Sequence, residues 1–305
     1  MVETARRDGL GRWALLAIAA LLAAGCSGGE ESESGPEEHA VRVGAFNFPE
    51  SEMIAEIYAQ ALEARGVPVE RLGAIGTREI VHPALELGFV DVVPEYAGTM
   101  LTFVSLGENE PTFDPHATVT ELRETLGPRG MIVLEPANAQ NQNVVVVRTS
   151  FAAEHGLYGV SDLTPLADTL TFGGPAECPE RPFCLIGLRE TYGLEFERFV
   201  PLPSSAVVAD SLELAEIDVG LMFTTDPAMI DGDFTALVDD RDLQPAENVV
   251  PVVRWESYVR WEPELGAALE DVSSRLDTVD LGLLNLRARD QEADIAELAR
   301  LWLAS

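Results

Sequence analysis

Short β-branched runs alternate with amphipathic segments along this chain, and no other feature restricts the fold as strongly. Strands are predicted over Val41–Phe46, Val67–Leu72 and Val90–Val93, with helices over Ser51–Ala64 and Ile80–Leu87 between them. Ser51 is a suitable helix N-cap, and Gly66 is expected to end that helix. The resulting β-α-β-α-β order is typical of an open parallel sheet, so the sequence predicts an α/β protein.

A second set of strands and helices follows the first. The run Val144–Val147 is β-branched throughout, which suits a strand that is buried on both faces. Further strands are predicted over Met131–Glu135, Leu170–Phe172, Val219–Phe223 and Val249–Val253, and helices over Thr118–Leu126, Ser150–His155, Leu185–Tyr192, Val207–Ala215, Glu262–Ser273 and Asp290–Leu303. About 265 residues follow the N-terminal segment, which is enough for two domains.

The N-terminal segment is predicted to be an export signal. Three arginines precede an apolar stretch, Trp13 to Ala24, that is too short to span a bilayer comfortably. Leu22 to Cys26 has the small-residue pattern of a bacterial lipoprotein cleavage site. We therefore expect a signal peptide over residues 1–25 and a lipid anchor on Cys26. A plain secretory signal is the alternative, and the arginine pair permits either general or twin-arginine export.

Acidic residues dominate the composition. Residues 26–40 are predicted to be a flexible acidic tether, because they offer nothing that could be buried. The chain has 52 acidic and 20 basic residues, all of the latter arginine, for a net charge of −32. This charge repels phosphate and so argues against nucleic-acid binding, whereas it attracts a cationic or zwitterionic ligand. Solubility or a saline habitat is the alternative explanation for most of these residues.

Two cysteines remain once Cys26 is assigned to the anchor. Cys178 and Cys184 form an even pair in a chain that we expect to be exported, and such a pair favours a disulfide. Two sulfurs without a nearby histidine make an incomplete zinc site, so no metal is expected.

The segment Asp91 to Thr99 combines a strand end with functional side chains. Proline cannot donate to a sheet ladder, so the strand should stop near Pro94. Gly98 then permits a turn, and Thr99 can cap the next helix. This arrangement would deliver Glu95 and Tyr96 to a loop beyond the strand, where ligands bind in α/β sheets. An ordinary strand-loop-helix junction is the alternative.

The same segment resembles a signature of the glycine betaine/choline/proline-betaine substrate-binding proteins of osmoprotectant ABC importers. Other stretches resemble the same family in the same order: Val43–Glu50, Pro175–Pro182, Asp218–Asp226, Leu237–Asp240 and Pro251–Arg254. The resemblance implies a bilobal fold like that of periplasmic binding proteins, with two open α/β lobes and a ligand cleft between them. Lobe 1 is expected over residues 41–138 and 246–305, and lobe 2 over residues 139–245.

The resemblance also implies a ligand and its contacts. A quaternary ammonium compound of the glycine betaine, choline or carnitine type has no N–H to donate, so aromatic faces are its natural partners. Tyr96 matches a ring of the family's cage, Phe223 lies where tyrosine is frequent, and Phe46 replaces a common lysine. Arg181 lies in the loop that supplies a partner for a ligand carboxylate. The implied ligand-binding residues are Phe46, Asn47, Glu95, Tyr96, Thr99, Asn143, Arg181, Phe223, Thr224 and Asp226.

Two departures from the family pattern concern the aromatic cage. Residues 138–143 contain no aromatic side chain, and Glu247 lies near the position of another cage tyrosine. A carboxylate at Glu247 or Glu95 could balance a cation, which suits choline or another amine without a carboxylate. Plainer roles stay open: Phe223 in a core, Arg181 as a solvated charge and Asn143 in a turn.

Other classes of function fit the sequence less well. The four histidines lie in no metal or nucleophile motif, and the sequence has no glycine-rich phosphate loop. We therefore expect no catalytic residue, cofactor or metal. A receptor for a different small amine or polar solute, a metal-ion receptor, or a tethered sensor lobe are the alternatives. The expected partners are an ABC permease with its ATPase and, through the anchor, the extracytoplasmic face of the cell membrane. The protein itself is expected to be a monomer.

Overall fold

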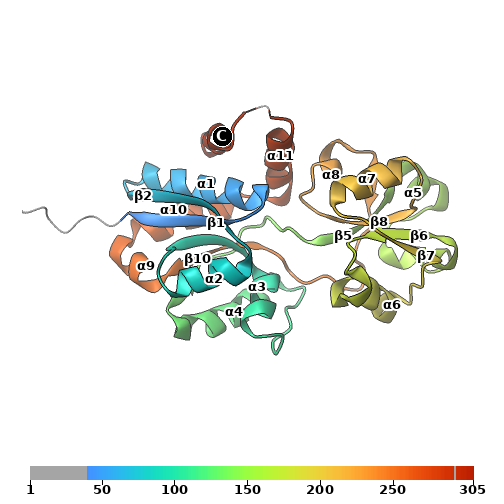
Figure 1. The fold of residues 1–305 in the computed structure, drawn as a ribbon, viewed down its shortest axis with the longest axis horizontal. Coiled ribbons are helices and arrows are strands. Elements are labelled where there is room, and N and C mark those ends of the chain that lie inside the picture. Colours follow the sequence, from blue (N-terminus) through green and yellow to red (C-terminus); the bar gives the residue numbers. More distant parts are fainter. Residues whose placement is uncertain (1–39, 292) are drawn as a thin grey trace, which may run out of the picture. The chain divides into compact units, whose positions relative to one another are not determined.

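Two mixed sheets, each flanked by helices, make up the described part of the chain (Figure 1). The computed structural model describes residues 40–291 and 293–305. The predicted signal peptide, Cys26 and all but the last residue of the predicted tether lie outside these residues. The predicted α/β class is confirmed. Within the described ranges, none of the helices combines the length and the apolar character that a bilayer crossing requires.

The first sheet has the strand order β2-β1-β3-β10-β4. Its strands are β1 (Val41–Phe46), β2 (Val69–Gly76), β3 (Val92–Tyr96), β4 (Met131–Val133) and β10 (Val249–Arg254). Its helices are α1 (Pro49–Ala64), α2 (Arg78–Glu86), α3 (Ala97–Val104), α4 (Pro115–Leu126), α9 (Trp255–Trp261), α10 (Glu264–Arg275), α11 (Thr278–Arg289) and α12 (Ile295–Leu303). The helices α10 and α12 both pack on α1, whose side chains Ile54, Ile57 and Tyr58 are fully buried.

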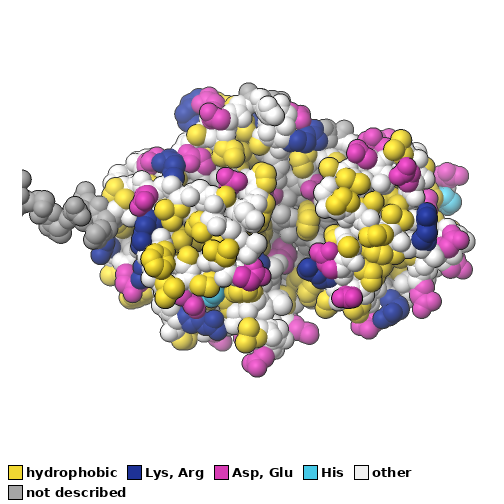
Figure 2. All heavy atoms as spheres, viewed as in Figure 1, with side chains coloured by type: hydrophobic (Ala, Val, Ile, Leu, Met, Phe, Trp, Pro, Cys, Tyr) yellow, Lys and Arg dark blue, Asp and Glu magenta, His cyan; other side chains and the backbone are white. Residues whose placement is uncertain are grey.

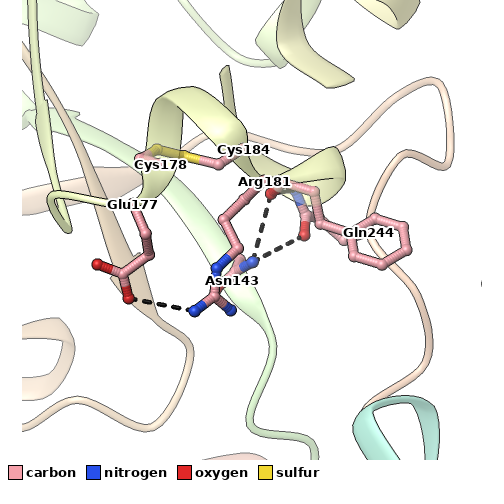
Figure 3. Close-up of a disulfide and its surroundings, with 7 residues drawn as sticks. Asn143, Glu177, Cys178, Arg181, Cys184 and Gln244 are labelled. Carbon is pink, nitrogen blue, oxygen red and sulfur yellow. Dashed lines mark hydrogen bonds and ion pairs between the residues drawn. A yellow bond between two sulfur atoms is a disulfide. The ribbon is translucent and has the colours of Figure 1, made fainter. Parts of the chain in front are cut away.

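The second sheet has the strand order β7-β6-β8-β5-β9. Its strands are β5 (Asn143–Arg148), β6 (Thr171–Gly174), β7 (Arg198–Pro201), β8 (Val219–Phe223) and β9 (Phe234–Ala236), and its helices are α5 (Thr149–His155), α6 (Gly187–Tyr192), α7 (Ser205–Glu213) and α8 (Ala228–Asp231). A disulfide joins Cys178 and Cys184 ahead of α6, with their Cα atoms 5.3 Å apart (Figure 3).

The predicted parallel arrangement is confirmed for the first three strands, but each sheet as a whole is mixed. The strands β1, β2 and β3 run parallel, but β10 pairs antiparallel with both β3 and β4. The chain reaches β10 only after it has built the second sheet, and β10 starts opposite the end of β3, with Val249 beside Tyr96. In the second sheet, β5 likewise runs antiparallel to β8 and β9.

The prediction that Pro94 ends its strand is wrong. Pro94 lies inside β3, in the middle of the sheet, directly opposite Pro251 of β10. Alternate residue pairs of an antiparallel ladder exchange no hydrogen bond, so two prolines can face each other there without loss. On the other side of β3, the ladder with β1 is limited to the pair of Val43 and Val92. The missing N–H of Pro94 therefore costs no ladder bond.

Two predicted helix caps are replaced by other contacts. The helix α1 begins at Pro49 with Phe48 as its N-cap, and the Ser51 hydroxyl instead accepts a hydrogen bond from the Phe46 N–H at 2.9 Å. Proline is favoured at the first helical position, which explains the earlier start. Thr99 is likewise not a cap, because it lies within α3, where its N–H and its hydroxyl both donate to Glu247.

The helices that were not predicted from the sequence include α9 and α11. The leucines of α11 are distributed around the helix instead of along one stripe, so the usual apolar periodicity is weak. The helix α9 buries none of its seven residues. Both lie between elements that the sequence did predict.

Gly98 allows the first turn of α3 to lie close to the segment before β10. A Cβ atom at this position would lie 2.8 Å from the backbone oxygen of Ala246, which cannot move without shifting the strand that follows. Its predicted role in a turn is therefore wrong, since Gly98 lies inside a helix.

We expect Gly98→Ala to lower the free energy of unfolding by about 1–3 kcal/mol, because overpacked sites of this kind must displace their neighbours. Urea denaturation followed by circular dichroism measures the change. Gly127→Ala is the matched control, since a Cβ atom there meets nothing within 4 Å and the backbone is already helical, with φ at −54°. Equal stabilities of the two variants would contradict this account of the packing.

Candidate functional site

A cavity of about 1470 Å³ is lined by side chains from both halves of the described chain. Its walls come from β1 and β2, the first turns of α1, the connection before β5, the end of β8, α11 and the start of α12. The residues that matter for chemistry are Phe48, Glu50, Asn141, Phe223, Asp226 and Asn285.

Glu50 is the centre of this cavity's hydrogen-bond network. Its side chain lies in the first turn of α1, where the helix dipole favours an acid, and the residue is only 6% exposed. Its Oε1 atom accepts hydrogen bonds from the Tyr96 hydroxyl at 2.6 Å and from Asn141 Nδ2 at 2.7 Å. Its Oε2 atom accepts from Asn285 Nδ2 at 2.6 Å. Within residues 40–291 and 293–305, no arginine or histidine forms an ion pair with this carboxylate.

Aromatic rings lie next to Glu50. The rings of Phe46 and Phe48 are stacked with centroids 5.8 Å apart, and the ring of Phe48 lies 6.0 Å from that of Tyr96. Burial, reinforced by the negative charge of Glu50, raises the pKa of Tyr96 well above 10, so its hydroxyl keeps the proton that it donates. Phe223 contributes a further ring to the cavity wall, and it is 40% exposed although it ends a strand of the core.

A second carboxylate, that of Asp226, faces the same cavity. Its Oδ2 atom accepts a hydrogen bond from the Phe223 N–H at 2.7 Å. Burial raises the pKa of Asp226, and the negative charge of Glu50 contributes to that increase. Asn285 connects the two regions, because its Nδ2 also donates to the backbone oxygen of Thr225 at 3.1 Å.

The cavity is rich in hydrogen-bond acceptors and poor in free positive charge. The Oδ1 atom of Asn141 is buried and has no hydrogen-bond partner within the described residues. Arg71, which lines the cavity, is held by Glu56 and Glu63 at 2.8 and 2.6 Å. Arg289 lines it too and pairs with Asp290 at 2.8 Å. The arrangement therefore suits a ligand that carries a positive charge or a donor.

A cluster beside the cavity contains further residues that the sequence singled out. Glu95 is buried and pairs with Arg78 at 2.9 Å, and the Arg78 guanidinium lies 5.0 Å from the centre of the Phe46 ring. Burial raises the pKa of Glu247 to about 7, although its hydrogen bonds from Thr99 and the charge of Arg78 act in the opposite direction. The Glu95 carboxylate thus already has a cation, and neither Glu95 nor Glu247 lines the cavity.

The predicted ligand-binding residues are only partly brought together. Phe223 and Asp226 line the cavity, and Tyr96 reaches it through Glu50. Phe46, Glu95 and Thr99 belong to the adjoining cluster. Asn47 is exposed at the end of β1, and its N–H donates to the Gly76 oxygen at 3.1 Å.

The other predicted residues serve contacts within the protein. The Thr224 hydroxyl donates to the Gln140 backbone oxygen at 2.8 Å, and this bond joins the segment after β8 to the segment before β5. Asn143 donates to the Phe183 oxygen and to Gln244 Oε1, both at 3.3 Å. The Arg181 side chain is 65% exposed and pairs with Glu177 at 3.3 Å, beside the disulfide (Figure 3).

Four of the six cavity residues that matter for chemistry were missed by sequence reasoning. Phe48 and Glu50 lie within the stretch that resembles the family's opening strand, so that stretch could have revealed them. Asn141 lies in the segment that was noted for its lack of aromatic residues, and of that segment only Asn143 was predicted to bind the ligand. Asn285 gave no signal, because the helix that carries it was not predicted.

On the face of the molecule shown in Figure 2, acidic side chains are spread out and do not gather at one place. The net charge of −32 therefore acts as a general field, and the specific contacts must come from the cavity.

Two α/β sheets that contribute to one ligand-sized cavity define the class of bilobal solute-binding proteins. Residues 39–305 match the family described as the substrate-binding domain of ABC-type glycine betaine transport systems, and the chain belongs to this family. The family consists of transport receptors and not of enzymes.

Individual proteins show the same relationship. The chain is 28% identical over 282 residues to a glycine-betaine-binding protein of Pseudomonas aeruginosa. The alignment covers 89% of this chain and 86% of the relative. It is 26% identical to the glycine betaine-binding protein YehZ of Escherichia coli, over 86% of this chain and 89% of the relative. In fold, it is similar to a crystal structure of a glycine betaine/carnitine/choline ABC transporter, with a TM-score of 0.79, 23% identity and coverage of 87% of this chain and 97% of that one.

Proposed function

We propose that this protein is the extracytoplasmic receptor of an ABC importer and that it binds a quaternary ammonium osmoprotectant of the glycine betaine, choline or carnitine type. The buried Glu50 carboxylate, which has hydrogen-bond donors but no cationic partner, is the observation that carries the proposal. An unpaired buried charge is costly, and a ligand cation next to it offsets part of that cost.

The rings around Glu50 supply the other half of the recognition. A trimethylammonium group cannot donate an N–H hydrogen bond, so it gains most from aromatic faces and from negative charge at close range. Phe48 offers one face on the α1 side and Phe223 offers another at the end of β8. The unpartnered Asn141 Oδ1 atom provides an acceptor for a ligand hydroxyl such as that of choline.

We assign the ligand to the space between two lobes, formed by residues 41–138 with 246–305 and by residues 139–245. Glu50 and Phe48 would come from the first lobe, and Phe223 and Asp226 from the second. A ligand held by both lobes favours a closed arrangement of the lobes, which an importer's permease can recognise.

The ligand assignment predicts that choline, glycine betaine or carnitine raises the melting temperature, because binding to the native state stabilises it. We expect Phe223→Leu to weaken the best of these ligands by about 5- to 30-fold in isothermal titration calorimetry, the equivalent of one cation–π contact of about 1–2 kcal/mol.

Phe89→Leu is the matched control, since Phe89 is 64% exposed and does not line the cavity. Equal affinities of the two variants would remove Phe223 from the site. If no quaternary ammonium compound binds the unmodified protein, the ligand assignment fails and a receptor for another small amine or polar solute takes its place.

The proposed importer also requires the receptor to stay near its permease. We propose that Cys26 carries a lipid and that residues 26–40 form the tether to the membrane. The cleavage pattern of residues 22–26 supports this assignment.

Mass spectrometry of the N-terminal peptide from membrane-isolated protein should find acyl chains on Cys26 and no residue before it. The Cys26→Ala chain should lose this modification. A mature N-terminus at another residue, without acyl chains, would show a plain secretory signal.

A further inference from the structure

The helix α9 presents apolar side chains on two adjacent faces. Tyr258 and Trp261 pack against the core of the first sheet. Trp255 and Val259 are one helical turn apart on the other face, and they are 56% and 52% exposed. No residue of α9 is buried, and Trp255 and Val259 are the apolar side chains of this helix that are most exposed to solvent.

The exposed surface continues from α9 onto the loop after α2. Leu87 and Phe89 are 72% and 64% exposed, and Gly88 between them lies under Arg254, the residue that precedes α9. These side chains lie at the end of the central strands that is opposite to the cavity, since β3 begins and β10 ends there. We call Leu87, Phe89, Trp255 and Val259 the α9 patch. Clusters of exposed apolar residues on a soluble domain indicate a binding surface.

The described chain begins beside α9. Ala40 lines the same depression as Ser257, Arg260 and Trp261 of α9, and Figure 1 shows α9 at the end of the sheet where β1 starts. From Cys26 to Ala40 the chain can span at most roughly 50 Å, because an extended residue covers about 3.3–3.6 Å. A lipid on Cys26 would thus hold the α9 patch within reach of the bilayer surface.

The charges around the patch are compatible with lipid headgroups. Arg42 and Arg254 are occupied by Asp91, and Arg254 also pairs with the exposed Glu256 at 2.9 Å. Arg260 is exposed and forms no ion pair within the described residues, so it is available to a headgroup phosphate. Tryptophan with a neighbouring arginine is the combination that membrane interfaces favour.

We propose that the α9 patch rests on the lipid bilayer, with Trp255 and Val259 in the headgroup region and Arg260 at phosphate level. The proposal rests on the proposed Cys26 anchor, because the anchor would raise the effective strength of membrane binding by the patch. A few exposed side chains give weak binding by themselves, and tethering raises the local concentration enough to make that binding count. The patch would then restrict how the receptor lies on the membrane between encounters with its permease.

The test uses the unlipidated chain from Ser27 onward, which keeps every described residue, together with phosphatidylcholine vesicles at high lipid concentration. Neutral vesicles avoid long-range repulsion by the net charge of −32. We expect measurable co-sedimentation, and quenching of tryptophan fluorescence by brominated lipid.

The double variant Trp255→Ser with Val259→Ser should reduce the vesicle-bound fraction about tenfold, as expected for loss of the main buried apolar area. Leu106→Ser with Phe113→Ser is the matched control, because these residues are 92% and 60% exposed in the segment between α3 and α4. It should bind vesicles like the unmodified chain.

Equal binding of the two double variants, or no binding of the unmodified chain, would overturn the proposal. Sedimentation velocity provides the other decisive result. If the unmodified chain is a dimer and the Trp255→Ser, Val259→Ser variant is a monomer, a second copy of the chain covers the patch and the membrane proposal is wrong. Calorimetry with choline on the two double variants separates the membrane proposal from the ligand proposal. None of the four substituted residues lines the cavity, so the affinity for choline should be unchanged in both variants, whether or not they bind vesicles.

Discussion

The buried carboxylate of Glu50 is the constraint on which the rest of the site depends. A charge that is nearly removed from water must be compensated, and here three donors from three distant segments supply hydrogen bonds. Hydrogen bonds to a charged group contribute roughly 1.5–3 kcal/mol each, so this set of donors offsets part of the cost of burying the carboxylate. It does not neutralise the charge, and the remaining negative potential points into the cavity.

The fold brings those donors together by its chain order. The end of β3 supplies Tyr96, the connection before β5 supplies Asn141, and α11 near the C-terminus supplies Asn285. Asn285 also bonds to the backbone at Thr225, just after β8. A ligand that competes for or completes this network therefore acts on segments of both halves at once. Coupling of ligand occupancy to the arrangement of the halves is what a transport receptor requires.

Much of the architecture could be predicted from the sequence, because it depends on local periodicity. The strands β1, β5 and β8 and the helix α1 follow clear apolar patterns. The direction of β10 and the place of Pro94 could not be predicted, since they depend on strand pairing across more than 150 residues. At the site, Tyr96, Phe223 and Asp226 came from motif resemblance. Asn285 was out of reach because the apolar periodicity of α11 is too weak to predict a helix there.

The central claim is that a quaternary ammonium group binds between the Glu50 carboxylate and the rings of Phe48 and Phe223. A crystal structure of the protein with choline, or with whichever quaternary ammonium ligand binds most tightly, tests it most directly. The account predicts that the ligand's nitrogen lies within about 6 Å of both ring centres and that its methyl groups contact the Glu50 carboxylate. A ligand nitrogen located elsewhere, for example on the Arg78 and Glu95 cluster with no contact to Glu50, would contradict it.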